Sequence, residues 1–356
     1  MTSLFDSYRL GTLRLPNRVV MAPMSRVRAT ADGLPTASMA TYYAQRATAG
    51  LIVTEGVYPS LVGQSNPGAP GLHTDAQAVA WRPVTDAVHA NGGRLFAQLM
   101  HGGRVGHPDV AGYQPVGPSA VALRAEVFTG ARGLQPAPVP RALEIGEIPG
   151  EAQAYADAAR RAIDAGFDGV ELHGANGYLI QQFLSSGANQ RTDAYGGSLT
   201  GRIRFAVEAA EATADAIGAD RVGIRLSPGG TVWDTVEDDV PELYGALFAE
   251  LARLDLAYVH VLATAAEDLL ITLRKAWPNA FILNPGGQIG PTPTGHADGE
   301  HWLAQGADLI GFGRAYLANP DLVERLRTGV PLRDNDKDTW YQGGDTGYLD
   351  YPSHQY

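Results

Sequence analysis

Short runs of apolar and β-branched residues recur along the chain, and the segments between them repeat apolar residues at helical spacing. This alternation is typical of βα units that build a parallel sheet. The chain offers eight strand candidates: 18–22, 51–55, 94–100, 168–173, 221–226, 257–262, 280–284 and 308–313. The helix candidates between them include 74–90, 151–165, 199–217, 240–254, 265–277 and 296–305. Eight strands predict an α/β fold of the closed (β/α)8 type, a TIM barrel.

The length of 356 residues permits either two domains or one large barrel, because barrels of about 250 residues tolerate long insertions. The first strand candidate is not followed by a GxGxxG sequence. A doubly wound dinucleotide-binding domain is therefore the weaker alternative. We expect a single barrel domain over residues 1–356.

Two segments depart from the βα pattern. Residues 112–150 contain six prolines and are too long for an ordinary connection. We interpret them as a lid or hairpin inserted after the third strand, over the mouth of the barrel. The tail, residues 331–356, is also irregular. Its aromatic residues indicate docking on the barrel rather than disorder; they are Trp340, Tyr341, Tyr348 and Tyr351.

Charge and composition exclude several classes of protein. The chain has 27 basic and 38 acidic residues, a net charge of −11, so nucleic acid and anionic membranes are poor partners. The absence of cysteine excludes disulfides, thiolate metal sites and cysteine nucleophiles. No apolar run approaches the ~18–20 residues of a membrane span, and the first residues lack a signal-peptide pattern. These features favour a cytoplasmic protein.

A metal site is not predicted. His296 and His301 lie five positions apart on a helix candidate, with Asp298 and Glu300 between them. A solvated helix face explains this spacing better than a set of metal ligands does.

Polar residues gather where the strand candidates end, and barrel enzymes carry their active sites on the loops at these ends. His173, Asn176 and Tyr178 follow the fourth strand. Two hydrogen-bond donors beside a phenol are suited to polarising a carbonyl and delivering a proton. The loops after the seventh and eighth strands predict a phosphate cradle formed by Gly286, Gly287, Gly313 and Arg314.

Several longer motifs follow one another along the chain: NRVVMAPMSR at 17–26, QLMHGGR at 98–104, the segment 173–202, IRLSP at 224–228, GRAYLANP at 313–320 and YQGG at 341–344. In this order they resemble the Old Yellow Enzyme family of FMN-dependent ene-reductases, also called NADPH dehydrogenases. The resemblance runs nearly from end to end.

The resemblance implies non-covalent FMN in the barrel. Gln98 and Arg225 would bind the pyrimidine edge of the flavin, where a guanidinium stabilises the negative charge of the reduced ring. The phosphate would bind at the cradle named above, and Gly56 would belong to the cofactor site. The residues expected along the ring are Ala22, Pro23, Met24 and Ser25.

The resemblance also implies the reaction. NADPH or NADH would reduce the flavin and leave, and an activated alkene would then enter the same site in a ping-pong mechanism. Enones, enals and maleimides would be substrates, with nitro compounds as further candidates. His173 and Asn176 would bind the substrate oxygen, and Tyr178 would protonate the α-carbon. The substrate pocket would include Met100, Trp233, Trp340 and Tyr341.

Other interpretations stay open at this point. Serine at position 25 replaces the threonine or cysteine of many relatives, and methionine at position 100 replaces a tryptophan. A different FMN oxidoreductase on the same barrel is one alternative, although the lack of cysteine excludes an iron–sulfur dienoyl reductase. A non-redox barrel or a silent flavin-binding protein is another. The sequence does not distinguish a monomer from a homo-oligomer.

Overall fold

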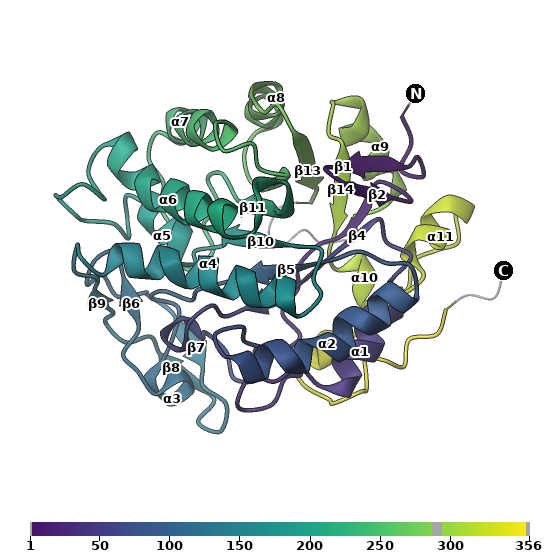
Figure 1. Ribbon diagram of the computed structural model, residues 1–356, viewed down its shortest axis with the longest axis horizontal. Coiled ribbons are helices and arrows are strands. Elements are labelled where there is room, and N and C mark those ends of the chain that lie inside the picture. Colours follow the sequence, from purple (N-terminus) through teal and green to yellow (C-terminus); the bar gives the residue numbers. More distant parts are fainter. Residues whose placement is uncertain (1, 287–293, 354–356) are drawn as a thin grey trace.

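The computed structural model describes residues 2–286 and 294–353. Its centre is a closed barrel of eight parallel strands in the order β10-β11-β12-β13-β14-β3-β4-β5 (Figure 1). The strands are β3 (Val19–Met21), β4 (Leu51–Val57), β5 (Leu95–Leu99), β10 (Gly169–Gly174), β11 (Val222–Leu226), β12 (Tyr258–Leu262), β13 (Ala280–Asn284) and β14 (Leu309–Phe312). The predicted TIM barrel is confirmed, and each predicted strand is present.

Helices surround the barrel and bury one face against it. Their bounds are α1 (Ala37–Ala44), α2 (Asp75–Ala90), α4 (Ile148–Asp164), α5 (Leu179–Leu184), α6 (Leu199–Ile217), α7 (Val240–Ala252), α8 (Glu267–Ala276), α9 (His296–Ala304), α10 (Ala315–Ala318) and α11 (Leu322–Thr328). Local sequence sets their ends. Thr74 and Gln77 form a reciprocal capping box at the start of α2. Gly218, with φ 91°, ends α6.

An N-terminal hairpin covers the end of the barrel opposite to the strands' carboxyl ends. It consists of β1 (Tyr8–Leu10) and β2 (Leu13–Leu15), paired antiparallel. Leu10 and Leu15 pack in one buried cluster with Val20, Leu51 and other residues from the beginnings of the barrel strands. The hairpin therefore closes the bottom of the barrel and leaves the opposite end for the site.

The connection between β5 and α4 contains only short elements. They are α3 (Pro108–Ala111), β6 (Val116–Gly117), β7 (Glu126–Phe128), β8 (Leu134–Pro136) and β9 (Arg141–Ala142). β7 and β8 form an antiparallel hairpin. Leu123 and Val127 pack with Val105, and the partly buried Tyr178 and Trp233 lie against this group. The connection thus contacts residues at the mouth of the barrel, and its action as a lid stays a prediction.

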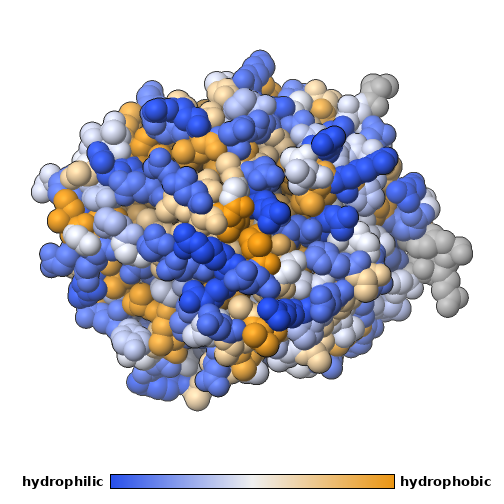
Figure 2. All heavy atoms as spheres, viewed as in Figure 1, coloured by the Kyte–Doolittle hydropathy of each residue, from blue (hydrophilic) through white to orange (hydrophobic). Residues whose placement is uncertain are grey.

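The C-terminal tail packs on the barrel, as its aromatic residues predicted. Tyr348 is fully buried, and its ring stacks on that of Tyr42 at 4.2 Å between centroids. Outside the barrel, the outward side of α4 is mostly hydrophilic (Figure 2). Within residues 2–286 and 294–353, no helix has the length and apolar character needed to cross a bilayer.

Candidate active site

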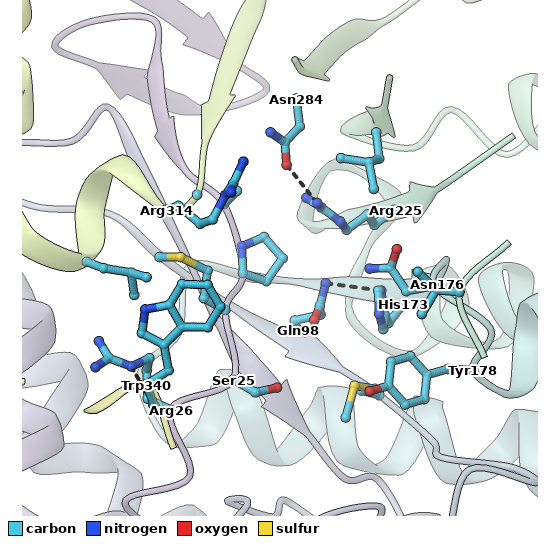
Figure 3. Close-up of a pocket in the computed structure, with 18 of the residues that line it drawn as sticks. Ser25, Arg26, Gln98, His173, Asn176, Tyr178, Arg225, Asn284, Arg314 and Trp340 are labelled. Atoms are coloured by element: carbon cyan, nitrogen blue, oxygen red, sulfur yellow. Dashed lines mark hydrogen bonds between the residues drawn. The ribbon is translucent and has the colours of Figure 1, made fainter. Parts of the chain in front are cut away.

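A cavity of about 510 Å³ opens at the carboxyl ends of the strands, within the size range of sites for cofactors and small ligands. Figure 3 shows its polar residues in two groups, with His173, Asn176 and Tyr178 on one side and Arg314 and Trp340 on the other. The lining residues are Ala22, Pro23, Met24, Ser25, Arg26, Gln98, Met100, His173, Asn176, Tyr178, Arg225, Val232, Trp233, Leu262, Asn284, Pro285, Thr294, Gly313, Arg314, Leu317, Trp340 and Tyr341.

The loop after β10 brings together the three residues predicted to act on the substrate. The rings of His173 and Tyr178 lie 5.1 Å apart between centroids. Between them, Asn176 and Gly177 adopt left-handed backbone conformations with φ values of 55° and 75°, which Asn and Gly tolerate best. A Cβ at position 177 would lie 2.5 Å from the carbonyl oxygen of Val232. This position therefore requires glycine, and the backbone of the loop packs closely against Val232.

The environment keeps the histidine and the tyrosine neutral. Burial lowers the pKa of His173 to about 3, and the charge of Arg225 adds to the effect. Burial raises the pKa of Tyr178 to about 12, while a hydrogen bond with the Trp233 side chain opposes this rise. At neutral pH the site therefore presents an uncharged imidazole and a protonated phenol, which both donate hydrogen bonds.

A buried carboxylate fixes the wall that follows β3. Glu55 accepts hydrogen bonds from the backbone N–H groups of Arg26 at 3.0 Å and Val27 at 2.8 Å. Val27 has φ 51°, an unfavourable conformation for a β-branched residue. Burial raises the pKa of Glu55, and the two N–H bonds oppose that rise. These bonds hold Ser25 and its neighbours in place along the cavity.

The floor of the cavity fits the polar edge of a flavin. Arg225 is buried and donates to Oδ1 of Asn284 at 2.7 Å. Among the described residues, Nε of Arg225 has no hydrogen-bond acceptor. Because Arg225 lines the cavity, this buried donor is available to a ligand bound there. Together with the side-chain amide of Gln98, it lies where the Old Yellow Enzyme resemblance places the pyrimidine edge of the flavin.

Two of the four residues predicted to hold a phosphate line the cavity, and their role stays a prediction. Gly313 and Arg314 follow β14 and line the cavity. Gly286 follows β13 with φ 90° but does not belong to the lining, and Gly287 falls outside the described residues. Gly56 is another predicted cofactor residue that does not line the cavity. A Cβ there would lie 2.5 Å from Sδ of Met100, so this glycine makes room for the methionine.

The predicted substrate residues all line the cavity, and arginines hold two of their loops. Arg104 donates through Nη2 to the carbonyl oxygens of Trp233 at 3.1 Å and Asp234 at 2.9 Å. Both acceptor residues have left-handed φ values, 54° and 57°. Arg124 adds an ion pair with the Asp234 carboxylate at 2.7 Å. Trp233 is thereby held at the mouth of the cavity.

Arginine side chains also hold the C-terminal tail, through hydrogen bonds to its backbone carbonyl oxygens. Arg26 donates to the carbonyl oxygen of Trp340 at 3.0 Å. Arg28 donates to the same oxygen at 2.7 Å and to that of Thr339 at 2.7 Å. Trp340 and Tyr341 reach the cavity from this anchored segment. The sequence predicted the two aromatic residues but not the arginines that position them.

Two buried residues beneath the cavity floor were also missed by the sequence analysis. Glu171 and His260 are fully buried, and their Oε2 and Nδ1 atoms lie 2.8 Å apart. A carboxylate inside an otherwise apolar strand was the available signal. The partners of this carboxylate could not be identified without knowing which strands lie beside β10 in the barrel.

The architecture and the site define a class of protein: a (β/α)8 barrel enzyme with a flavin-type site at the carboxyl ends of its strands. The chain belongs to the NADH:flavin oxidoreductase / NADH oxidase family, which it matches over residues 3–333. The predicted relationship to Old Yellow Enzyme is confirmed, and the protein is an FMN-dependent oxidoreductase.

Individual relatives cover almost the whole chain. It is 40% identical to a chanoclavine-I aldehyde reductase of Penicillium roqueforti, over 99% of this chain and 96% of the relative. It is also 40% identical to 12-oxophytodienoate reductase 7 of Oryza sativa subsp. japonica, over 98% and 94%.

Solved structures agree with this assignment. Morphinone reductase in complex with tetrahydroNAD superposes with a TM-score of 0.94 and 42% identity, over 100% of this chain and 98% of the other. An Old Yellow Enzyme homologue from Zymomonas mobilis gives a TM-score of 0.93 and 40% identity, over 98% and 99%.

Proposed function

We propose that the cavity binds FMN and catalyses the NAD(P)H-dependent reduction of the C=C bond of activated alkenes. The observation that carries the proposal is the convergence of His173, Asn176 and Tyr178 on a cavity whose floor carries Gln98 and Arg225. When bound, FMN accepts a hydride from a reduced nicotinamide and passes it to the alkene. A structural neighbour that binds tetrahydroNAD supports a nicotinamide nucleotide as the hydride source.

In this proposal, the chain's residues hold the cofactor as follows. Gln98 and Arg225 hold the pyrimidine edge, and Gly313 with Arg314 holds the phosphate. The wall after β3, which carries Ser25, would contact the ring. Because Arg225 is buried, its charge acts at low dielectric and favours an electron-rich ring.

On the substrate, His173 and Asn176 donate hydrogen bonds to the carbonyl or nitro oxygen. Negative charge develops on this oxygen as a hydride reaches the β-carbon, so these donors act mainly in the transition state. Tyr178 gives its proton to the α-carbon, which completes the addition of one hydride and one proton across the double bond. The raised pKa of Tyr178 keeps that proton on the phenol until it is needed.

The substrates predicted for this site are enones, enals and maleimides. Relatives named as reductases of 12-oxophytodienoate and of morphinone support the reduction of unsaturated carbonyl compounds. His173 and Asn176 are neutral donors that bind the same substrate oxygen. A substrate therefore needs only one activating oxygen. A cytoplasmic location and one FMN-binding domain over residues 1–356 remain predictions from the sequence.

Isotope labelling tests this assignment. Cyclohexenone is reduced with nicotinamide-4-deuterated NADPH in ordinary water, and in a second reaction with unlabelled NADPH in D₂O. We expect deuterium at the β-carbon in the first product and at the α-carbon in the second. Reduction of the carbonyl group instead of the double bond would refute the proposal.

A further inference from the structure

Below the floor of the cavity, the carboxylate of Glu171 lies in one hydrogen-bond network with the side chains assigned to the flavin and to the alkene substrate. It is fully buried inside the barrel. Its oxygens accept hydrogen bonds from Nε2 of Gln98 at 2.8 Å, from the hydroxyl of Tyr258 at 3.1 Å and from Nδ1 of His260 at 2.8 Å. All three donor side chains are buried as well.

The strand register produces this cluster. Glu171 and His173 are two residues apart on β10, so both side chains point to the same side of the strand. Glu171 pairs with Gln98 on β5, and His173 pairs with Arg225 on β11. Arg225 in turn pairs with His260 on β12. The register therefore brings the carboxylate beside Gln98 and one pairing level away from His173, Arg225 and His260.

A glycine opposite the carboxylate makes room for the hydrogen bond from Tyr258. Gly223 on β11 pairs with Glu171, and a Cβ at Gly223 would lie 2.3 Å from the ring of Tyr258. Without a side chain at that position, the tyrosine ring lies over β11 and its hydroxyl reaches the carboxylate on β10.

One branch of hydrogen bonds runs from Glu171 to Arg225. An ionised carboxylate only accepts hydrogen bonds, so Nδ1 of His260 must carry the ring proton. Nε2 of His260 is then the acceptor. Nη1 of Arg225 lies 2.7 Å from Nε2 and 3.2 Å from Nδ1, so the shorter contact is the hydrogen bond. The other terminal nitrogen of Arg225 donates to Asn284. The guanidinium is thus fixed from two sides.

The second branch runs from Glu171 to His173. Nε2 of Gln98 donates to Glu171 and lies 3.3 Å from Nδ1 of His173. Because that amide nitrogen only donates, Nδ1 of His173 is the acceptor and the ring proton sits on Nε2. The oxygen of the Gln98 amide is left as an acceptor for a ligand.

We propose that Glu171 is a positioning residue, which orients Arg225 and Gln98 for the flavin and fixes His173 as an Nε2–H donor to the substrate. The inference rests on the proposed function for the identity of the two ligands. It goes beyond it by assigning opposite tautomers to two histidines: a proton on Nδ1 of His260 and on Nε2 of His173.

The charges of the cluster agree with this assignment. Burial lowers the pKa of His260 to about 4 and that of His173 to about 3, so both rings are neutral. Burial raises the pKa of Glu171, but His260 and Arg225 bring it below its usual range. The cluster therefore holds one anion and one cation, linked through neutral groups.

The test is ¹⁵N NMR of the holoprotein with labelled histidine, which distinguishes protonated from unprotonated ring nitrogens. Resonances are assigned by their loss in His173→Asn and His260→Asn. In the parent at pH 7.5 we expect the two tautomers given above. The opposite tautomer at either ring would overturn the proposal, and this measurement needs no variant at position 171.

Glu171→Gln provides the second test. The introduced amide offers one acceptor and one donor where the carboxylate offered two acceptors, so either the His260 branch or the Gln98 branch must reverse. We expect at least one of the two histidines to change tautomer. We also expect FMN to bind about tenfold more weakly to the apoprotein, the value of one lost hydrogen bond to a charged group.

Glu208→Gln is the matched control, because Glu208 also accepts a hydrogen bond from a tyrosine, Tyr195, at 2.8 Å but lies on α6 outside the barrel. It should leave both tautomers and FMN affinity at parent values. Unchanged tautomers in Glu171→Gln would overturn the inference, even if alkene reduction is intact. If the parent protein shows the expected tautomers but does not reduce the alkene, the proposed function is overturned and the inference about Glu171 is not.

Discussion

The side-chain nitrogen of Gln98 lies 3.3 Å from Nδ1 of His173. The residue assigned to the edge of the flavin therefore also contacts the residue assigned to the substrate oxygen (Figure 3). Flavin binding and substrate polarisation share one buried hydrogen-bond network in this account. Substitutions on the floor of the cavity should consequently affect both.

Tyr178→Phe should separate the two half-reactions. The substitution removes the hydroxyl group that donates the proton. We therefore expect the oxidative half-reaction with cyclohexenone to slow about 10²-fold or more. Flavin reduction by NADPH should keep its rate, because no proton is required there from this residue. Stopped-flow absorbance at the flavin band measures both steps.

Tyr195→Phe is the control for this experiment. It removes a hydroxyl that donates to Glu208 at 2.8 Å, away from the cavity, and should leave both half-reactions unchanged. Full alkene turnover by Tyr178→Phe would show that solvent or another residue supplies the proton.

Arg104→Ala should loosen the loop that carries Trp233. Two carbonyl oxygens in left-handed residues would lose their shared donor, and we expect the free energy of unfolding to fall by about 1–3 kcal/mol. The KM for cyclohexenone should rise, because Trp233 lines the cavity. Urea unfolding and steady-state kinetics measure the two effects.

Arg124→Ala offers a comparison on the same loop. Its ion pair with Asp234 is exposed on the arginine side, with 81% of that side chain accessible, and pairs of this kind contribute little. Stability and KM should stay at parent values. Equal effects of the two substitutions would contradict the role given to Arg104.

Stability should decrease as the pH falls below about 6.5. The pKa values of His173 and His260 are lowered from 6.5 to about 3 and about 4, so the unfolded chain binds protons that the folded chain does not. Their contribution is complete above pH 6.5 and is lost as the pH falls to about 4 for His260 and to about 3 for His173, at about 1.4 kcal/mol per pH unit for each histidine. Urea unfolding at pH 7.5 and 5.5 measures the slope.

Substitution identifies the source of this slope. His260→Gln should reduce the pH dependence, because it removes a buried ring whose pKa is lowered to about 4. The same slope in His260→Gln and the parent would argue against a buried neutral histidine at this position.

Ser25→Thr should change the flavin midpoint potential and preserve alkene turnover. Both residues supply a hydroxyl at the cavity wall, but the added methyl group changes the packing beside the ring. Spectroelectrochemical titration compares the variant with the parent and with Ser119→Thr, a substitution in the connection between β5 and α4. Identical potentials in all three would remove any special role for serine at position 25.

The barrel was predictable from sequence because strands and helices of ordinary length repeat a clear pattern. The strand at Ala280–Asn284 and the helix at Leu199–Ile217 even have the predicted bounds. The N-terminal hairpin was missed because three-residue strands give too little period-two signal. Helix α1 was missed for a similar reason, since it has only eight residues.

The site was predictable where residues follow strands and carry a family motif, as with His173 and Arg225. Glu171 and His260 were not, because their importance depends on which strands are neighbours when the barrel closes. Sequence order puts them 89 positions apart. The packing of Arg26 against the distant tail likewise had no local signal.

The most direct test of the central claim is an anaerobic absorbance titration of the purified protein with NADPH, followed by addition of cyclohexenone. We expect a yellow flavin band that bleaches with NADPH and returns with the enone. A band that bleaches but does not return would contradict the assignment of alkene reduction to this site. Protein without a flavin band would contradict FMN binding.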